Sequence, residues 1–455
     1  MSVRFTPPYP DPHPTRSSLV MRFVRGWNSW IHVLFDRSYT MKMGEIHTPA
    51  LSFYIANELP LVRRIMDEEW RLFPKHRFMQ DLLDPLIGNS VFSANGEDWA
   101  EQRAMVNPAF GHTALKTVFP LMLGAVDDLV ARLESTPPGE PVHLDPLLTH
   151  LAADIIFRTL FSVTLDEARS REIYEAFHDY QRDAQRASML RLYRLPQLGY
   201  LRRSKAAARR IHAVFAGLVA ARYAATVERG ERGNDIVQAL IDAEHPQTGE
   251  RFSATKVMEQ VSTIFLAGHE TAASSMTWAL YLAARDPALQ DAIRAETAAA
   301  GDGPLAYEHL RALAETRNLF RETLRLYPPV AFLTREVTCP TRMRDKDLQP
   351  AAMLVVSPWL IQRNRDNFPD PHGFDPDRFD DPAQAEACRH AYLPFGKGPR
   401  ICVGAGFANQ EAVLAIASVL RRFRLSVPGG HVPEPVSRLT LRPKDGVRLL
   451  LERLD

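Results

Sequence analysis

Apolar residues recur at helical spacing over much of the chain, with few glycines or prolines between them. Repeats of three and four residues place such positions on one face of a helix. The pattern predicts four long helices, at 115–135, 149–162, 206–229 and 253–285. The last is followed by Asp286-Pro287, where aspartate suits an N-cap and proline suits the first turn of another helix. A helix as long as 253–285 would cross a whole domain.

Short β-like runs interrupt the helical pattern. Residues 39–43 and 50–55 predict a strand pair near the N-terminus, and 353–356 predicts a strand in a later, proline-rich region. No linker, internal repeat or low-complexity block divides the chain. We therefore expect one domain over residues 1–455, mainly α with small β-sheets, with residues 1–40 as an N-terminal extension.

Composition and charge narrow the class of protein. The chain has 455 residues, 45% of them hydrophobic, and a formal net charge of +1. This composition is typical of a globular protein with a large core, and the balanced charge gives no support to nucleic-acid binding. Three cysteines, Cys339, Cys388 and Cys402, are too few and too far apart for a disulfide framework, which indicates a reducing compartment. Because no apolar run has the length of a signal peptide or membrane span, we expect a cytoplasmic protein without a transmembrane segment.

A glycine-rich loop delivers Cys402 to the start of an alanine-rich helix, in the sequence FGKGPRICVG. A helix N-terminus offers positive potential and free N–H groups, which lower the pKa of a thiol and favour the thiolate. Gly396, Gly398 and Gly404 would let the backbone approach the sulfur and a flat cofactor closely. Arg400 would pair with a carboxylate of that cofactor.

The same loop resembles the heme-binding signature of the cytochrome P450 family, Phe-x-x-Gly-x-Arg-x-Cys-x-Gly, and every fixed position is met. The resemblance implies heme b as cofactor, with Cys402 as the axial ligand of its iron and with Phe395, Gly396 and Gly404 beside it. It also implies the cytochrome P450 fold of the soluble bacterial type, with heme between a long central helix and the helix after the cysteine. The competing interpretation is a buried structural cysteine in a tight turn.

The middle of the longest predicted helix, from Ala267 to Thr271, resembles the oxygen-activating segment of the family. Glycine inside a helix costs about 0.5 to 1 kcal/mol relative to alanine, so we interpret Gly268 as widening a groove for dioxygen and water. The resemblance implies that Thr271 hydrogen-bonds dioxygen and that Glu270 passes protons inward, with Ala267 against the heme. The alternative is a threonine bonded to its own helix and a glutamate on a solvated face. His269 is expected to be a packing residue.

A second motif has a structural meaning. Glu322 and Arg325 are three residues apart, which places both on one face of a helix, and Arg378 follows before the cysteine loop. In this order they resemble the buried Glu-Arg-Arg network of the family. Removing one member of such a network leaves an uncompensated charge.

Three arginines and a tryptophan are candidate partners of the heme propionates. Trp99 and Arg103 match the family's Trp-x-x-x-Arg helix, in which the indole N–H and the guanidinium hold a propionate. Arg335 occupies a place where relatives often keep another such partner. Together with Arg400 they form the expected propionate site.

The resemblance also places a pocket and a lid. The substrate pocket is expected to be lined by Phe265, Ala267, Val330, Phe332 and Leu333. This apolar set implies an apolar or amphipathic small molecule. Residues 176–212 correspond to the mobile lid of relatives. Residues 184–227 contain nine arginines or lysines and no acidic residue, which indicates either a solvated basic face or attraction of an anionic substrate or membrane surface.

By resemblance the chain is a monomeric heme-thiolate monooxygenase that hydroxylates or epoxidises its substrate. It would use dioxygen and electrons from a separate ferredoxin or flavodoxin with its reductase. One alternative is a peroxygenase or isomerase without a redox partner, which the pair Glu270 and Thr271 disfavours. Another is a non-catalytic heme sensor, for which the sequence contains no output segment.

Overall fold

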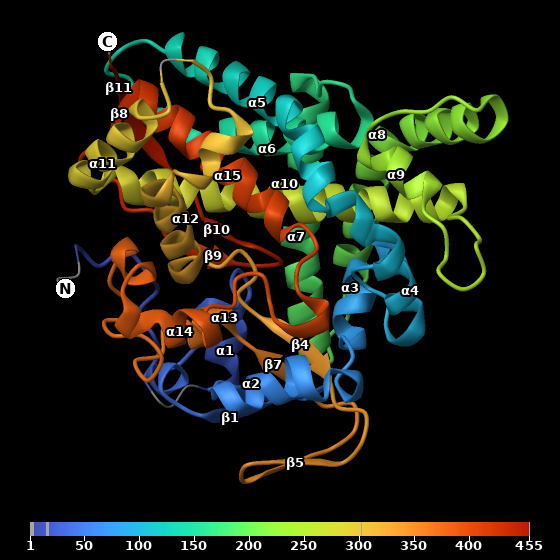
Figure 1. The fold of residues 1–455 in the computed structure, drawn as a ribbon. Coiled ribbons are helices and arrows are strands. Elements are labelled where there is room, and N and C mark those ends of the chain that lie inside the picture. Colours follow the sequence, from blue (N-terminus) through green and yellow to red (C-terminus); the bar gives the residue numbers. More distant parts are fainter. Residues whose placement is uncertain (1–3, 15–17, 302, 455) are drawn as a thin grey trace.

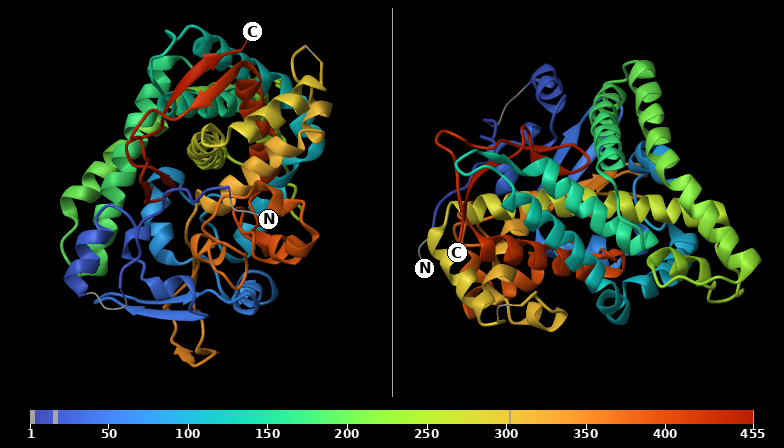
Figure 2. Two further views of the ribbon diagram at one scale, coloured as in Figure 1. Left: turned by 90° about the vertical axis from the view of Figure 1, so that its left-hand side faces the viewer. Right: turned by 90° about the horizontal axis from the view of Figure 1, so that it is seen from above.

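One long helix, α10 (Ala254–Ala284), runs through the middle of the molecule. The computed structural model describes residues 4–14, 18–301 and 303–454. Figure 1 shows α10 crossing the fold from side to side, and the left view of Figure 2 shows it end-on with the other elements around it. Ser253 caps α10 by accepting a hydrogen bond from the backbone N–H of Lys256 at 3.3 Å. Most of its side chains are buried, because α6, α8, α12 and α15 all pack against it.

The helices account for most of the described chain. They are α1 (Leu19–Gly26), α2 (Leu59–Arg63), α3 (Arg77–Ile87), α4 (Gly96–Val106), α5 (His112–Glu134), α6 (Leu144–Phe161), α7 (Glu167–Leu192), α8 (Leu198–Arg229), α9 (Ile236–Asp242), α10 (Ala254–Ala284), α11 (Pro287–Ala298), α12 (Ala314–Leu326), α13 (Pro358–Ile361), α14 (Ala385–His390) and α15 (Ala405–Arg422). The four predicted long helices are confirmed as α5, α6, α8 and α10.

The strands form small sheets. They are β1 (Met43–His47), β2 (Ser52–Ala56), β3 (Val142–His143), β4 (Leu333–Glu336), β5 (Thr341–Met343), β6 (Lys346–Leu348), β7 (Met353–Val356), β8 (Phe423–Ser426), β9 (Pro435–Ser437), β10 (Leu441–Pro443) and β11 (Arg448–Arg453). The largest sheet has the order β1-β2-β7-β4, with β2 parallel to β7 and the other pairs antiparallel. The other sheets are β3-β11-β8, β9-β10 and β5-β6.

The predicted strand pair is partly displaced. The second strand is β2 and the later run is β7, as expected, but the first strand begins only at Met43. Asp36–Tyr39 forms a tight helical turn instead, with Tyr39 buried. The hydroxyl of Tyr39 accepts a hydrogen bond from the indole N–H of Trp359 at 2.9 Å. This tertiary contact overrides the strand propensity of the aromatic residue.

The segment expected as an N-terminal extension packs onto the fold; its residues 1–3 and 15–17 lie outside the described chain. The α1 helix lies against the C-terminal end of α7. The ring of Phe23 meets that of Tyr193 edge-on at 4.9 Å, and Gln185 donates to the carbonyl of Gly26 at 2.7 Å. Helices α7 and α8 lie side by side, as the right view of Figure 2 shows. Together α1, α7 and α8 therefore cover one side of α10.

Candidate active site

A cavity of about 540 Å³ reaches from the Cys402 loop to α3, α7 and the tip of the β9–β10 hairpin. One wall is the middle of α10, which contributes Ile264, Ala267 and Thr271. The strand β4 and the loop before it contribute Val330, Phe332 and Leu333, as the sequence predicted. A volume of this order is typical of small-molecule and cofactor sites.

The Cys402 loop is fixed by its own backbone and by its neighbour. The N–H of Cys402 donates to the carbonyl of Phe395 at 2.9 Å. Gly396 and Gly398 have φ of 75° and 71°, in the left-handed region that favours glycine. A Cβ on Gly398 would lie 2.0 Å from the carbonyl oxygen of Met66, so this glycine allows the loop to dock on the segment Arg64–Glu68. Gly404 has an ordinary φ of −86° and needs no such freedom.

The thiol of Cys402 lies where the cavity wall meets the start of α15. Burial raises its pKa, and the backbone N–H of Gly404, followed by Arg103 and Lys75, acts in the opposite direction. The expectation of a lowered pKa is therefore wrong for the thiol taken alone, because loss of solvent outweighs the helix N-terminus. A metal ion reverses the balance, since a coordinating thiol is deprotonated outright.

Four cations line the cavity near Cys402: Lys75, Arg103, Arg335 and Arg400. Arg103 donates to the carbonyl of Ile401 at 2.8 Å, and Arg400 donates to that of Ala94 at 3.0 Å. Arg335 donates only to the carbonyl of its neighbour Thr334, at 2.9 Å. Lys75 bonds the carbonyl of Phe92. None of the four has a carboxylate partner anywhere in the described chain.

The absence of carboxylates beside these four cations indicates that the site fits an anionic ligand. Burial lowers the pKa of Arg335 to about 10, and burial together with Arg335 and Arg103 lowers the pKa of Arg400 to about 9. The buried Nε of Arg400 has no hydrogen-bond partner among the described residues. Unpaired buried cations are costly, so the site is complete only with an anionic ligand. Heme b fits this arrangement, because the four cations would hold its propionates and Cys402 would ligate its iron.

Trp99 stands beside these cations. Its ring meets Trp70 edge-on at 5.1 Å, and the guanidinium of Arg400 lies 4.3 Å from its centroid. The side chain is 5% exposed and lines the cavity. The structure thus brings Trp99, Arg103, Arg335 and Arg400 to one place, as the sequence predicted, and adds Lys75.

The face that α10 turns to the cavity differs from the prediction at two positions. Phe265 does not line the cavity; it packs against Phe215 at 4.7 Å and against His269 at 4.7 Å between ring centroids. Ile264 occupies the place expected for it. Gly268 lines the cavity as well, and a Cβ on it would lie 2.7 Å from Cδ1 of Ile156, so the missing side chain also allows close packing with α6.

Thr271 and His269 take opposite sides of α10. Thr271 lines the cavity, while its hydroxyl donates to the carbonyl of Ala267 at 2.7 Å, so it is both bonded to its own helix and available from the cavity. His269 is buried, and its Nδ1 lies 2.9 Å from the carbonyl of Phe265. His269 is a packing residue, as expected.

Glu270 is 1% exposed, which excludes the alternative of a glutamate on a solvated face. Its Oε1 accepts hydrogen bonds from Gln181 and Thr440, each at 3.0 Å, and forms an ion pair with Arg442 at 3.0 Å. Burial alone would raise the pKa of Glu270, but Arg442 and two nearby histidines lower it below its ordinary value. The carboxylate is therefore held ionised inside the protein.

The ion pair of Glu270 extends toward α7. His178 lies against the guanidinium of Arg442, and burial followed by Arg442 lowers the pKa of His178 to about 4. Asp145 lies 3.8 Å from the same guanidinium. Arg442 thus joins the hairpin, α6, α7 and α10.

A separate ionic network lies in the core below the cysteine loop. Arg325 donates from Nε and Nη2 to the two oxygens of Glu322, both at 2.7 Å. Arg378 donates from Nε to Glu322 at 3.2 Å. All three side chains are at most 1% exposed. Further bonds to Gln362, Pro371 and Gly373 carbonyls satisfy the remaining donors of Arg325.

The cations of the basic segment 184–227 lie outside the cavity wall, although Gln185, Met189, Leu192 and Tyr193 of the same segment line it. Four of its cations have acidic partners: Arg191 with Asp81, Arg203 with Asp183, Arg210 with Asp179 and Arg222 with Asp235. None of the nine lines the Cys402 cavity. The attraction of an anionic substrate by this segment stays a prediction, since acids of other segments pair with four of its nine cations and none of the nine reaches the cavity wall.

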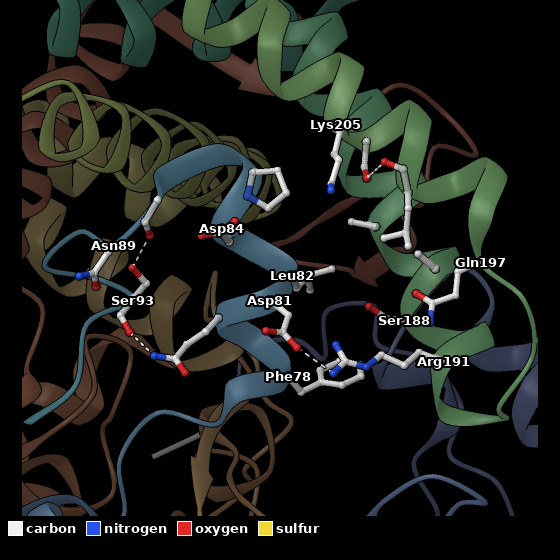
Figure 3. Close-up of a pocket in the computed structure, with 17 residues that line it drawn as sticks. Phe78, Asp81, Leu82, Asp84, Asn89, Ser93, Ser188, Arg191, Gln197 and Lys205 are labelled. Carbon is white, nitrogen blue, oxygen red and sulfur yellow. Dashed lines mark hydrogen bonds and ion pairs between the residues drawn. The ribbon is translucent and has the colours of Figure 1, made fainter. Parts of the chain in front are cut away.

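A second hollow of about 500 Å³ lies between α3 and the pair α7 and α8 (Figure 3). Arg191 of α7 reaches Asp81 of α3 across it at 2.8 Å, while Lys205 projects from α8. Phe78 and Leu82 line this hollow and the main cavity alike. Helix α3 is thus the partition between them.

Sequence reasoning missed Lys75, His178 and Arg442. No local motif marks them, because each lies far along the chain from the site residue that it approaches: Cys402 for Lys75, and Glu270 for His178 and Arg442. Separately, none of the described helices combines the length and apolarity needed to cross a bilayer.

Comparisons with known proteins agree with this geometry. The Cytochrome P450 family profile matches residues 7–450. The chain is 34% identical to cyclooctatin synthase of Streptomyces melanosporofaciens, over 79% of this chain and 78% of the relative. It is 31% identical to cyclooctat-9-en-7-ol 5-monooxygenase of the same organism, over 83% and 81%.

Mammalian relatives and solved structures also match. Taurochenodeoxycholic 6 alpha-hydroxylase of Sus scrofa is 29% identical over 84% of this chain and 79% of its own length. The crystal structure of the cytochrome P450DA heme domain superposes with a TM-score of 0.80, covering 91% of this chain and 90% of that one at 23% identity, which confirms the fold. With this fold, the cysteine loop and the profile match over nearly its whole length, the chain belongs to the cytochrome P450 family.

Proposed function

We propose that this heme-dependent monooxygenase hydroxylates or epoxidises an apolar or amphipathic small molecule bound between α3, α7 and the middle of α10. Membership of the family establishes the monooxygenase class and heme b as cofactor. The substrate class is inferred from the lining of the cavity, which is mainly hydrophobic between Thr271 and helices α3 and α7.

Several elements contribute to this apolar wall. The side chains are Phe78, Leu82, Leu86 and Ile87 of α3, Phe177 and Met189 of α7, Ile264 of α10, and Val330, Phe332 and Leu333 near β4. Burial of aliphatic and aromatic surface favours binding by about 25 cal/mol per Å². Two relatives are named for a 5-monooxygenase and a 6 alpha-hydroxylase activity, which supports hydroxylation as the reaction.

The residues near Cys402 are proposed to bind the heme. Cys402 would ligate the heme iron, and Arg103, Arg335, Arg400 and Lys75 would hold the propionates. Bound heme supplies the redox-active iron at which dioxygen is activated. Ala267, Phe395, Gly396 and Gly404 line the cavity on the two sides available to a flat ring. The network of Glu322, Arg325 and Arg378 would keep the loop in place from below.

Glu270 and Thr271 are proposed to deliver protons. The hydroxyl of Thr271 is on the cavity wall and can pass a proton from Oγ1. The carboxylate of Glu270 faces Arg442, so it takes up a proton only when that ion pair opens. Gln181 and Thr440 would orient the carboxylate until then.

Electrons are proposed to come from a separate ferredoxin or flavodoxin with its reductase, with the enzyme acting as a monomer. The test is product formation from a panel of apolar substrates with reductant and dioxygen supplied together or singly. The proposal expects product only with both. Product from hydrogen peroxide alone, or from a hydroperoxide without reductant, would favour the peroxygenase or isomerase alternative. Heme binding without any product would favour a sensor.

The same preparation tests the ligand role of Cys402. Reduced protein under carbon monoxide should show the red-shifted absorption of a thiolate ligand. Cys402→Ala should lose that absorption and the activity. An unchanged spectrum in Cys402→Ala would refute the assignment.

A further inference from the structure

We propose that Arg438, at the tip of the β9–β10 hairpin, binds an anionic group of the substrate, so that the preferred substrates are apolar molecules carrying a carboxylate. This inference rests on the proposed function and narrows its substrate class. It moves the recognition of negative charge from the basic segment of α7 and α8 to one residue inside the cavity.

The position of Arg438 is fixed by the backbone around it. The N–H of Ser437 donates to the hydroxyl of Ser29 at 3.0 Å, and the N–H of Trp30 donates to the carbonyl of Ser437 at 2.8 Å. Arg438 itself lines the cavity that contains Cys402 and Thr271. Its place in the wall is therefore held on both sides by secondary and tertiary hydrogen bonds.

The guanidinium of Arg438 makes one hydrogen bond to the described residues. Its Nε donates to the carbonyl of Asn28 at 3.3 Å. Its two Nη groups make no hydrogen bond, and the group makes no ion pair, with any residue the structure describes. Four N–H bonds in a planar fork are thus left for a ligand, and this fork matches the geometry of a carboxylate.

The charged groups that shift the pKa of Arg438 are all positive. Burial, followed by Arg442, Arg186 and Arg182, lowers its pKa. Arg442 is already paired with Glu270, and Arg182 lies 2.9 Å from Asp179. Acidic partners therefore neutralise the charges of Arg442 and Arg182, whereas Arg438 has no acidic partner among the described residues.

Arg186 adds to the excess of positive charge. Its guanidinium lies 5.8 Å from the ring of Trp27 and 6.0 Å from that of Tyr200, and its Nε is buried without a described hydrogen-bond partner. Arg438 and Arg186 are therefore two half-buried cations without an acidic partner among the described residues. A bound carboxylate would offset their repulsion and the cost of partial desolvation.

The remaining wall defines the rest of the ligand. Leu439 stands next to Arg438, and Phe177, Met189 and Ile264 continue the lining toward Thr271. A ligand with its acid at Arg438 would lay an apolar body along these side chains. Arg438 and Cys402 lie on different elements of the cavity wall, so the acid and the oxidised carbon of such a ligand would occupy different parts of the cavity.

The experiment is a spectral titration of the holoenzyme, following the change of heme spin state on binding. Probes are paired apolar acids and methyl esters, such as abietate with methyl abietate and dodecanoate with methyl dodecanoate. We expect the wild-type enzyme to bind at least one acid more tightly than its ester. Arg438→Gln should weaken that acid about 10- to 100-fold, as loss of a charge-assisted bidentate contact does, and leave the ester nearly unchanged.

Two further variants make the result specific. Arg202→Gln removes the same charge from an exposed arginine of α8 that lines neither hollow, and it should leave both affinities unchanged. Arg438→Lys keeps the charge and should recover part of the acid affinity. An intact reduced carbon monoxide spectrum in Arg438→Gln shows that the variant is folded and loaded with heme.

The outcomes separate this inference from the proposed function. A panel in which no acid binds more tightly than its ester overturns the role of Arg438, as does an equal loss of acid and ester affinity in Arg438→Gln. Neutral substrates oxidised with reductant and dioxygen would then still support the monooxygenase. Absence of any product that requires both would instead overturn the proposed function.

Discussion

Arg442 and Glu270 form an ion pair of 3.0 Å between the C-terminal hairpin and the centre of α10, with side chains 8% and 1% exposed. Breaking a buried pair from one side strands the other charge and costs about 3 to 5 kcal/mol. Arg442→Met is therefore expected to lower the free energy of unfolding by about that amount. Urea unfolding of the heme-loaded protein measures it. The matched control is Arg251→Met, which removes an exposed pair with Glu244 and should change little.

The same pair predicts a dependence on pH. Because Arg442 and the neighbouring histidines lower the native pKa of Glu270, the stability it contributes is present above the ordinary carboxyl range and is lost as pH falls through the lowered value. In Arg442→Met the largest influence that opposes burial is lost, and we expect burial to raise the pKa of Glu270 above its ordinary value. Stability of the variant should then decrease as pH rises through that raised value, the opposite sign. Parallel pH profiles for the two proteins would contradict this account.

The cations near Cys402 predict opposite effects on apoprotein and holoprotein. Arg335 has no acidic partner in the described structure, so Arg335→Met should leave the apoprotein as stable as before or make it more stable. The variant should bind heme about 10- to 100-fold more weakly, because a charge-assisted bond to a propionate is lost. Thermal unfolding of the apoprotein and heme transfer to apomyoglobin measure the two quantities. A destabilised apoprotein with unchanged heme affinity would assign Arg335 a structural role instead.

Two glycines of the cysteine loop should respond differently to alanine. Both have positive φ, and this alone costs about 1 to 2 kcal/mol for an alanine. A Cβ on Gly398 would also meet the backbone of Met66 at 2.0 Å, whereas a Cβ on Gly396 would meet only side chains at 3.9 Å or more. Gly398→Ala should therefore lose most of its heme, and Gly396→Ala should keep it. Heme content per protein, measured with Gly429→Ala as control, distinguishes them, and equal loss in both would count against the docking of the loop on Met66.

Glu322 is expected to be a stability residue. Glu322→Gln leaves Arg325 and Arg378 buried without a counter-charge, at a cost of about 3 to 5 kcal/mol. The expected result is a large decrease in the urea midpoint with the spectrum of the remaining folded protein unchanged. Glu308→Gln, which removes an exposed pair with Lys116, provides the comparison. A normal midpoint together with an altered spectrum would place Glu322 in the heme site rather than below it.

The sequence by itself determined the features that depend on residues close together in the chain, namely the long helices and the cysteine loop. Four long helices follow from apolar spacing, and the cysteine loop follows from ten consecutive residues, so Cys402 could be proposed as the heme ligand from the sequence alone. The order of the motifs also indicated that Glu322, Arg325 and Arg378 would meet. Local spacing did not predict the structure where a contact with a distant segment competed with strand propensity. At Tyr39, the hydrogen bond from Trp359 stabilises a turn in place of the predicted strand.

Tertiary structure decided which side chains face each other across the fold. The face of α10 that meets the cavity includes Ile264 and not Phe265, because helix rotation is fixed by packing against α6 and α8. The partner of Glu270 is Arg442, and Arg438 lines the cavity without an acidic partner among the described residues, both on a hairpin near the C-terminus. Charge in a sequence can be counted, but whether it is neutralised depends on distances between remote segments. Only the folded chain shows that four of the nine basic residues at 184–227 pair with acids while Arg438 does not.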